Sequence, residues 1–229
     1  MARENIVIAI DGYSSCGKST VAKAVAKELN FVFVDSGAMY RAVTLYFLRH
    51  GIDFNDQSAV VEALDNIQID FVPQVDSTAD ILLNGENVSE EIRAMAVSDK
   101  VSEVAAIKAV RTAMVAQQQA LGSRRNIVMD GRDIGTTVFP DADLKIFMTA
   151  DPEVRAARRY VELKAKGQSV SLDEIRENLA HRDHIDSTRE ESPLRQADDA
   201  VVLDNSAMNH DTQLQFVLDL VAKIEKKNA

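Results

Sequence analysis

Residues 12–20 read Gly-Tyr-Ser-Ser-Cys-Gly-Lys-Ser-Thr and follow the spacing G-x-x-x-x-G-K-[ST]. The run before them, residues 5–10, is short, apolar and β-branched, which is typical of a buried parallel strand. After them, apolar side chains recur at helical spacing from Val21 to Leu29. A strand, a glycine loop and a helix in this order aim backbone N–H groups and a helix N-terminus at an anion. The pattern therefore predicts a phosphate-binding loop in an α/β fold.

This loop also predicts how a nucleoside triphosphate and its metal ion would be held. Lys18 is expected to reach the outer phosphates, and the Ser19 hydroxyl is expected to ligate Mg²⁺. The candidate nucleotide-binding residues are Gly12, Tyr13, Ser14, Ser15, Cys16, Gly17, Lys18, Ser19 and Thr20.

Short apolar runs alternate with helical patterns along the rest of the chain. They lie at residues 6–10, 31–34, 127–129, 144–148 and 200–203. This alternation predicts three layers, with helices on both faces of a central parallel sheet of about five strands. Ligands of such sheets bind beyond the carboxyl ends of the strands. Several aspartates follow these runs, and some of them are expected to face the site: Asp11, Asp35, Asp130 and Asp204.

One segment, residues 65–90, departs from this alternation. Two runs of strand length at 67–72 and 79–83 flank the tight-turn signal Asn84-Gly85, and residues 86–88 can return as a third strand. We expect a small antiparallel insert here. It is either an edge subdomain without chemistry or a flap over a substrate.

Two long helical stretches follow the insert. Residues 97–121 carry an apolar stripe, and residues 152–189 hold two helical patterns joined at 167–170, with Asp151 as the expected N-cap. The second stretch and the residues just after it carry more arginines than a plain surface helix pair needs: Arg155, Arg158, Arg159, Arg176, Arg182, Arg189 and Arg195.

Charge and cysteine content limit the partners and the compartment. The formal net charge of −10 argues against a surface that grips nucleic acid. The single cysteine, Cys16, excludes an internal disulfide, and a small filler role for it is favoured over a redox role. No apolar run approaches the roughly 20 residues of a membrane span, and no secretory signal pattern is present. We therefore expect a cytoplasmic protein, monomeric, without nucleic-acid or membrane partners.

Two further strand ends carry groups suited to phosphate chemistry. Residues 35–41 join Asp35 and small residues to Arg41, which suits a second phosphate site. The apolar run 127–129 closes on Asp130, as in a Walker B element whose carboxylate holds Mg²⁺, and Arg132 and Asp133 follow. The candidate metal ligands are Ser19 and Asp130. Together with the loop, these segments indicate transfer between two bound nucleotides.

At these positions the sequence resembles the bacterial cytidylate kinases of the nucleoside monophosphate kinase family. The matching segments are 12–20, 35–41, 85–89, 91–93, 130–136, 138–142, and Arg182-Asp183 with Asp186 and Arg189. The resemblance implies ATP-dependent phosphorylation of CMP and dCMP, in pyrimidine nucleotide metabolism. It also implies a core at about 1–35, 122–150 and 196–229, a monophosphate-binding part at 36–121 and a mobile helical lid at 151–195.

The resemblance further implies roles for individual residues. Those expected to bind the monophosphate are Ser36, Arg41, Ser102, Arg111, Arg132, Asp133, Arg182, Asp186 and Arg189. Within this set, Ser102, Arg111 and Asp133 would read the cytosine. Those expected to act on the phosphates during transfer are Lys18, Arg132, Arg155, Arg158, Arg159 and Arg189.

The chain also departs from the family pattern. Tyr13-Ser14-Ser15-Cys16 stands where Pro-Ser-Gly-Ala is common, and Ile185 stands where relatives often carry an arginine. A kinase acting on UMP, AMP or a non-nucleotide acceptor is the nearest rival interpretation. A nucleotide-switch GTPase is disfavoured, because no Asn-Lys pair is present for guanine. A non-catalytic nucleotide binder and a metal pair at His181 and His184 are disfavoured as well.

Overall fold

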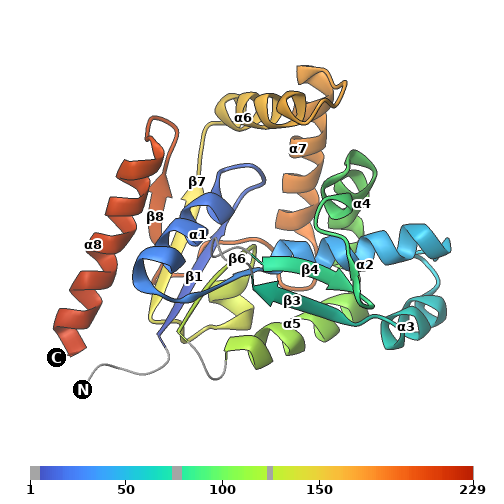
Figure 1. Cartoon of the computed structure of the whole chain (residues 1–229), viewed down its shortest axis with the longest axis horizontal. Coiled ribbons are helices and arrows are strands. Elements are labelled where there is room, and N and C mark those ends of the chain that lie inside the picture. The colour runs from blue at the N-terminus through green and yellow to red at the C-terminus, as the bar shows by residue number, and fades with distance from the viewer. Residues whose placement is uncertain (1–5, 74–78, 123–125, 229) are drawn as a thin grey trace.

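A parallel sheet forms the centre of the protein (Figure 1). The computed structural model describes residues 6–73, 79–122 and 126–228. Within these residues the sheet has five strands, in the order β2 (Val32–Asp35), β6 (Ile127–Gly131), β1 (Val7–Gly12), β7 (Leu144–Thr149) and β8 (Val201–Asp204). Every neighbouring pair is parallel, so the predicted sheet is confirmed.

Helices cover both faces of this sheet, as the alternating pattern predicts. In β1, Ile8 and Ile10 pack in the cluster formed with α1 (Lys18–Leu29) and α8 (His210–Asn228). Ala9, between them, belongs to the cluster on the other face, against α5 (Lys108–Gly122) and the π-helical turn η2 (Ile134–Val138). Side chains of a strand alternate between faces, so the apolar run at residues 7–10 of β1 packs against both helical layers.

The segment at 65–90 forms the expected antiparallel insert. Its strands are β3 (Ile69–Pro73), β4 (Ala79–Leu83) and β5 (Glu86–Asn87). The turn before β5 places Asn84 at φ 51° and Gly85 at φ 84°, as a tight hairpin turn requires. The turn signal in the sequence therefore located this hairpin correctly.

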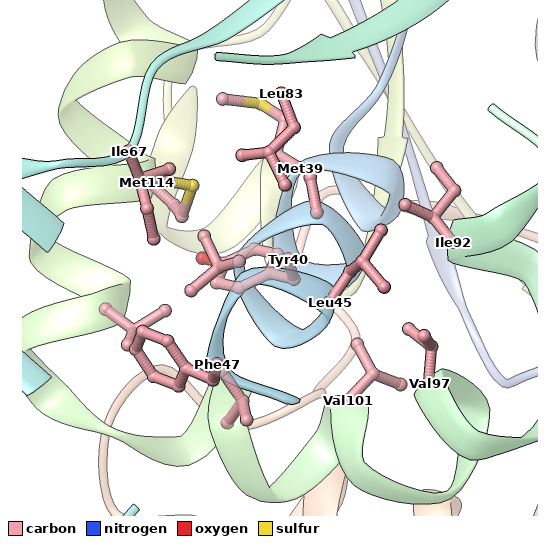
Figure 2. Close-up of a cluster of buried hydrophobic side chains, with 14 of the residues drawn as sticks. Met39, Tyr40, Leu45, Phe47, Ile67, Leu83, Ile92, Val97, Val101 and Met114 are labelled. Carbon is pink, nitrogen blue, oxygen red and sulfur yellow. The ribbon is translucent and has the colours of Figure 1, made fainter. Parts of the chain in front are cut away.

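The insert packs on α2 (Ser36–His50), which is buried along most of its length (Figure 2). Met39 and Leu45 of α2 meet Leu83 of β4, Ile92 of η1 (Glu91–Arg93) and neighbouring apolar side chains in one cluster. Helices α3 (Gln57–Asp65) and α4 (Met95–Ala106) also contribute to this cluster, as does α5 through Val110 and Met114. Since α2 begins directly at the end of β2, this second core is attached to the carboxyl edge of the sheet.

The stretch expected to be helical at 97–121 is divided in the structure. Ile107 adopts an extended conformation with ψ 122° and separates α4 from α5. The break frees the carbonyl of Ala105, which accepts a hydrogen bond of 3.3 Å from the Arg111 guanidinium. No glycine or proline marks the break, so the apolar stripe alone could not reveal it.

The second helical stretch has the expected form. It contains α6 (Pro152–Ala165) and α7 (Leu172–Thr188), and Asp151 caps α6 by accepting from two backbone N–H groups. Ser171 and Glu174 form a capping box at the start of α7. Among the described residues, we find no helix with the length and apolar character needed to cross a membrane.

Candidate active site

The phosphate loop joins β1 to α1, and its glycines occupy positions that a larger residue would not tolerate. A Cβ at Gly12, where φ is 149°, would lie 2.0 Å from the Met148 carbonyl oxygen. Gly17 has φ 91° and precedes α1 without any capping side chain. No side chain therefore competes with an anion for the N–H groups at the start of α1.

A cleft of about 540 Å³ opens against this loop. Its wall includes the loop and helix residues Ser14, Ser15, Gly17, Lys18, Ser19 and Thr20. Further basic side chains line it, namely Lys23 of α1 and, from other parts of the chain, Arg41, Arg93, Arg132, Arg158, Arg159 and Arg182. Such a concentration of cationic groups, on a chain of net charge −10, favours a ligand with several phosphates.

Three predicted loop residues lie away from the lining of this cleft: Gly12, Tyr13 and Cys16. Cys16 is fully buried, packs with the core beneath α1, and has its Sγ 3.0 Å from the Tyr13 carbonyl oxygen. Tyr13 packs edge-on against Phe147, with ring centroids 5.8 Å apart. These contacts fit the small-filler interpretation of the cysteine.

Lys18 is held inside the loop. Its ammonium donates to the carbonyl oxygens of Gly12 and Tyr13, at 2.9 and 2.7 Å. Burial lowers the pKa of Lys18, and the nearby positive charge of Arg132 lowers it further. The amine therefore lies at the cleft wall with its donors shared among backbone oxygens, close to where phosphates would enter.

Asp130, at the end of β6, forms an acidic site with Ser19. The Ser19 hydroxyl donates to Asp130 Oδ2 at 2.8 Å, and within the described part of the chain the buried Oδ1 has no hydrogen-bond partner. Burial, followed by the charge of Asp35, raises the pKa of Asp130 to about 7. A hydroxyl beside a carboxylate with an unused oxygen is a donor set that suits a hard divalent cation. The predicted metal ligands thus lie together and fit Mg²⁺.

Asp35 pairs in register with Asp130 on the neighbouring strand and lines the same cleft. Burial works to raise the pKa of Asp35, but Arg41, 3.0 Å away, and Arg93 outweigh it and hold the pKa below its usual value. Arg41 Nε is buried without a partner in the described structure. This donor is available to an anion in the cleft.

A smaller cavity of about 50 Å³ adjoins the cleft and shares lining residues with it, including Arg41, Arg132 and Arg182. Its wall contains all nine predicted monophosphate-binding residues, namely Ser36, Arg41, Ser102, Arg111, Arg132, Asp133, Arg182, Asp186 and Arg189. The structure therefore brings all of the predicted substrate residues to one place.

The floor of this cavity is a buried ion pair between Arg111 and Asp133, whose side chains are both 4% exposed. The Arg111 guanidinium lies over the Tyr40 ring, 5.4 Å from its centroid. Arg189 lies 3.7 Å from the other Asp133 oxygen. The Asp133 carboxylate, a hydrogen-bond acceptor, and the Arg111 guanidinium, a donor, thus lie side by side away from solvent. This arrangement can form hydrogen bonds with the polar edge of a ring.

A second charged cluster joins this cavity to the cleft. Asp186 accepts from Arg132 Nε at 2.7 Å and lies 3.8 Å from Arg189. Arg182 donates to Ser98, and its buried Nε has no partner among the described residues. Burial, with the positive charge of Arg132, lowers the pKa of Arg182 to about 10. The positive charges of these crowded arginines repel one another, and a bound phosphate is expected to offset that repulsion.

The three arginines of α6, Arg155, Arg158 and Arg159, differ in their surroundings. Arg158 donates twice to Asn205, at 2.9 Å each, and Arg159 donates to Glu162 at 2.8 Å, and both line the cleft. Arg155 is absent from the described lining of either cavity and instead donates to the Ser14 carbonyl oxygen at 3.2 Å. Its role at the ATP phosphates stays a prediction.

Sequence reasoning missed Asn205 and Gln213. Asn205 Nδ2 donates to the Cys16 carbonyl oxygen at 2.7 Å and to Gln213, so the end of β8 supports the phosphate loop. Both residues line the cleft. The strand-end rule indicated the preceding Asp204, which is exposed and bonds to Ser206 instead. An asparagine one position beyond a strand end carries no motif that could have identified it.

Of the four strand-end aspartates, Asp35 and Asp130 line the cleft, as expected for some of them, and Asp11 has a different role. It is buried, and its two oxygens accept from the N–H groups of Ile134 and Gly135, at 2.8 and 2.7 Å. It therefore anchors η2 and does not line the cleft. His181 lies 3.6 Å from Glu103. Among the described residues, no three His, Cys, Asp or Glu side chains lie close enough together to hold a metal ion.

Comparison with known proteins identifies the family. A family model described as cytidylate kinase matches residues 8–223. The chain belongs to the cytidylate kinase family. A protein of Bacteroides thetaiotaomicron named cytidylate kinase is 55% identical over 228 residues, which cover 98% of this chain and 100% of that protein. The cytidylate kinase of Flavobacterium johnsoniae is 52% identical over 227 residues, covering 97% and 99%.

The likeness to solved structures is more distant. An uncharacterized protein from Eubacterium ventriosum aligns over 96% of this chain and 99% of its own, with a TM-score of 0.51 and 12% identity. At that identity the match shows the fold alone, and it agrees with the α/β architecture described above.

Proposed function

We propose that this chain transfers the γ-phosphoryl group of ATP to CMP, and also to dCMP, giving ADP with CDP or dCDP. The observation that carries the proposal is a pair of adjoining cavities that share Arg41, Arg132 and Arg182. One opens on the phosphate loop, and the other ends at the buried pair Arg111–Asp133. Two ligands placed there would meet at the shared arginines.

ATP would occupy the larger cavity, with its phosphates on the loop and Lys18 at their outer end. Arg158 and Arg159 would approach from the lid, since both line this cavity. Ser19 and Asp130 would hold Mg²⁺, a fit supported by the unused Asp130 oxygen. Bound there, the ion would neutralise charge on the phosphate oxygens.

CMP would place its base against Arg111, Asp133 and Ser102. Cytosine presents an amino group that a carboxylate can accept from, and ring acceptors that a guanidinium can donate to. Uracil would turn a carbonyl oxygen toward Asp133 and leave two acceptors facing each other. An unpaired buried group costs about 1–3 kcal/mol, so the pair is suited to select cytosine.

Transfer would need alignment and charge compensation rather than a general base, because the acceptor is already a phosphate anion. The transition state spreads charge over the equatorial oxygens of the transferring group. Lys18, Arg132 and Arg189 would face those oxygens or the acceptor phosphate. An arginine at this position is worth about 10³–10⁵ in rate in enzymes of this chemistry.

Closure of the helical lid at about 151–195 would exclude water during this step. The proposed core at 1–35, 122–150 and 196–229 would stay fixed, and the part at 36–121 would carry the monophosphate. The single cysteine supports a cytoplasmic location for the reaction.

A coupled assay of ADP release, with ATP and Mg²⁺ and each of CMP, UMP, AMP and GMP, tests the proposal. CMP is expected to give the highest kcat/KM of the four. A higher value for any other monophosphate would assign a different acceptor. Hydrolysis of GTP without an acceptor, at a rate comparable to turnover, would instead support a switch protein.

A further inference from the structure

Ser14 stands out in the phosphate loop because each of its polar groups is engaged. Its N–H donates to Asp183 Oδ1 at 3.1 Å, and its carbonyl oxygen accepts from Arg155 at 3.2 Å. Its hydroxyl accepts from Arg132 at 2.7 Å. These partners come from α7, from α6 and from the segment after β6. One loop residue is therefore fixed from three separate elements.

Asp183 and Arg155 are also bound to each other. The second carboxylate oxygen of Asp183 pairs with the Arg155 guanidinium, and the two side chains are only 14% and 8% exposed. Arg155 is held further by the Ala150 carbonyl oxygen at 3.2 Å and by the Tyr13 ring, 5.4 Å from its centroid. Neither residue belongs to the described lining of the two cavities. In this structure the pair contacts the loop and lies outside the space where nucleotides would sit.

The loop has a local reason to depend on such contacts. Ser15, next to Ser14, is a non-glycine residue at φ 57°, in the left-handed region that disfavours side chains. A strained conformation persists only when its surroundings hold it. Ser14, directly before Ser15, is held at its N–H by Asp183 and at its carbonyl oxygen by Arg155, so the peptide bonds on both sides of Ser14 are fixed.

We propose that Asp183 and Arg155 form a latch that positions the phosphate loop for ATP, acting through Ser14 without touching the nucleotide. Both are positioning residues. The latch also sets the distance between the loop and the lid, because α6 carries Arg158 and Arg159 and α7 carries Arg182. The inference rests on the proposed function only in taking ATP as the ligand of the loop.

Calorimetric titration of the purified full chain with ATP alone, and separately with CMP alone, tests this inference. The variants are Asp183→Asn, Arg155→Gln and the double variant, with Glu177→Gln as a matched control. Glu177 is an exposed carboxylate of the same helix, so the control makes the same change of charge. The melting temperature Tm of each variant is measured first.

Each single variant is expected to raise the Kd for ATP about tenfold, as for loss of one charged hydrogen bond. The double variant should raise the Kd for ATP by about the same factor as either single variant, because the first substitution already abolishes the interaction between the two residues. The Kd for CMP should stay within about twofold of wild type, since neither residue lines that cavity. Arg155→Lys, a milder variant that keeps the charge, should raise the Kd for ATP by a smaller factor, about threefold.

Three results would overturn the latch. If both single variants bind ATP with unchanged affinity, whether or not their Tm is lower, Asp183 and Arg155 have a purely structural role. Losses that add in the double variant would show that the residues act separately. A normal Kd for ATP with a lower kcat in Arg155→Gln alone would place Arg155 on the transferring phosphoryl group. Failure of wild type to phosphorylate CMP would refute the proposed function but leave the ATP titrations readable.

Discussion

The ammonium of Lys18 donates to two carbonyl oxygens of its own loop and lies at the wall of the cleft. Lys18→Ala should therefore lower kcat for phosphoryl transfer at least about a hundredfold, by removing a cation from the developing charge. The fold should survive, because a buried amine of lowered pKa contributes little to stability. Turnover of CMP and the Tm are the two measurements. Near-normal turnover would contradict the placement of ATP on this loop.

Asp133 gives a prediction of selectivity. Asp133→Ala should lower kcat/KM for CMP by about 10²–10³, because Arg111 is left without its buried partner. The Kd for ATP should change little, since Asp133 lines only the smaller cavity. Steady-state rates with varied CMP and a separate ATP titration measure the two effects. Equal losses for both ligands would mean that Asp133 is a structural residue.

Residues that carry a motif were predictable, and residues defined by tertiary contact were not. Ser19 and Asp130 were found from the loop and the strand end, and they lie in hydrogen-bond contact. Asn205 and the pairing of Asp183 with Ser14 had no local signal, because each depends on a partner more than a hundred positions away. Residue spacing along the chain predicts local geometry, but it does not predict a contact with a residue that is distant in the sequence.

Among the elements, η2 depends on a buried acid. Burial, partly offset by hydrogen bonds from Gly135 and Ile134, raises the pKa of Asp11 to about 6. The folded state therefore binds a proton more tightly than the unfolded state, and this group's contribution to stability falls as pH rises from about 4 to 6. The Asp11→Asn variant does not titrate at this position. The Tm of wild type should therefore fall by several degrees relative to the Tm of this variant as the pH rises from about 4 to 6.

Melting curves of wild type and Asp11→Asn at several pH values check this prediction. The difference in Tm, variant minus wild type, should rise from pH 4 to 6 and stay level above 7. Groups common to both proteins cancel in the difference. A constant difference over the whole range would mean that Asp11 has an ordinary pKa.

The start of α7 gives a prediction of stability. Ser171 accepts from the Glu174 N–H at 3.2 Å, while the Glu174 carboxylate accepts from the Ser171 N–H at 2.7 Å. Ser171→Ala should lower the free energy of unfolding by about 1 kcal/mol, since it removes the cap. Ser187→Ala, an exposed serine inside the same helix, is the control and should have a smaller effect. Chemical denaturation measures both.

Element types were more predictable than element boundaries or strand order. The alternation of apolar runs predicted the parallel sheet, and Asn84-Gly85 predicted the hairpin. The break at Ile107 was missed because an extended residue between two helical stripes preserves much of the apolar pattern. The order β2-β6-β1-β7-β8 depends on long crossovers, and nothing in a single strand specifies its neighbours.

At the scale of the whole molecule, both ligands must be present before the site is complete. The two cavities share their arginines, so CMP and ATP would each complete part of the other's surroundings. ATP alone should therefore be hydrolysed at well under about a hundredth of the rate of transfer to CMP. Phosphate release with and without CMP measures this ratio. Comparable rates would mean that water reaches the transferring group freely.

The position of β1 has a consequence for biosynthesis. It precedes the other strands of the described sheet along the chain, yet it lies at the middle of that sheet, between β6 and β7, with Val7 opposite Ile127 and Ile8 opposite Leu144. A ribosome must release the chain past Gly131 before β1 gains even one of these neighbours. Until then its apolar side chains have no partner in a sheet, and nascent chains in this condition are prone to aggregate. Assembly of this protein is therefore expected to occur late in translation.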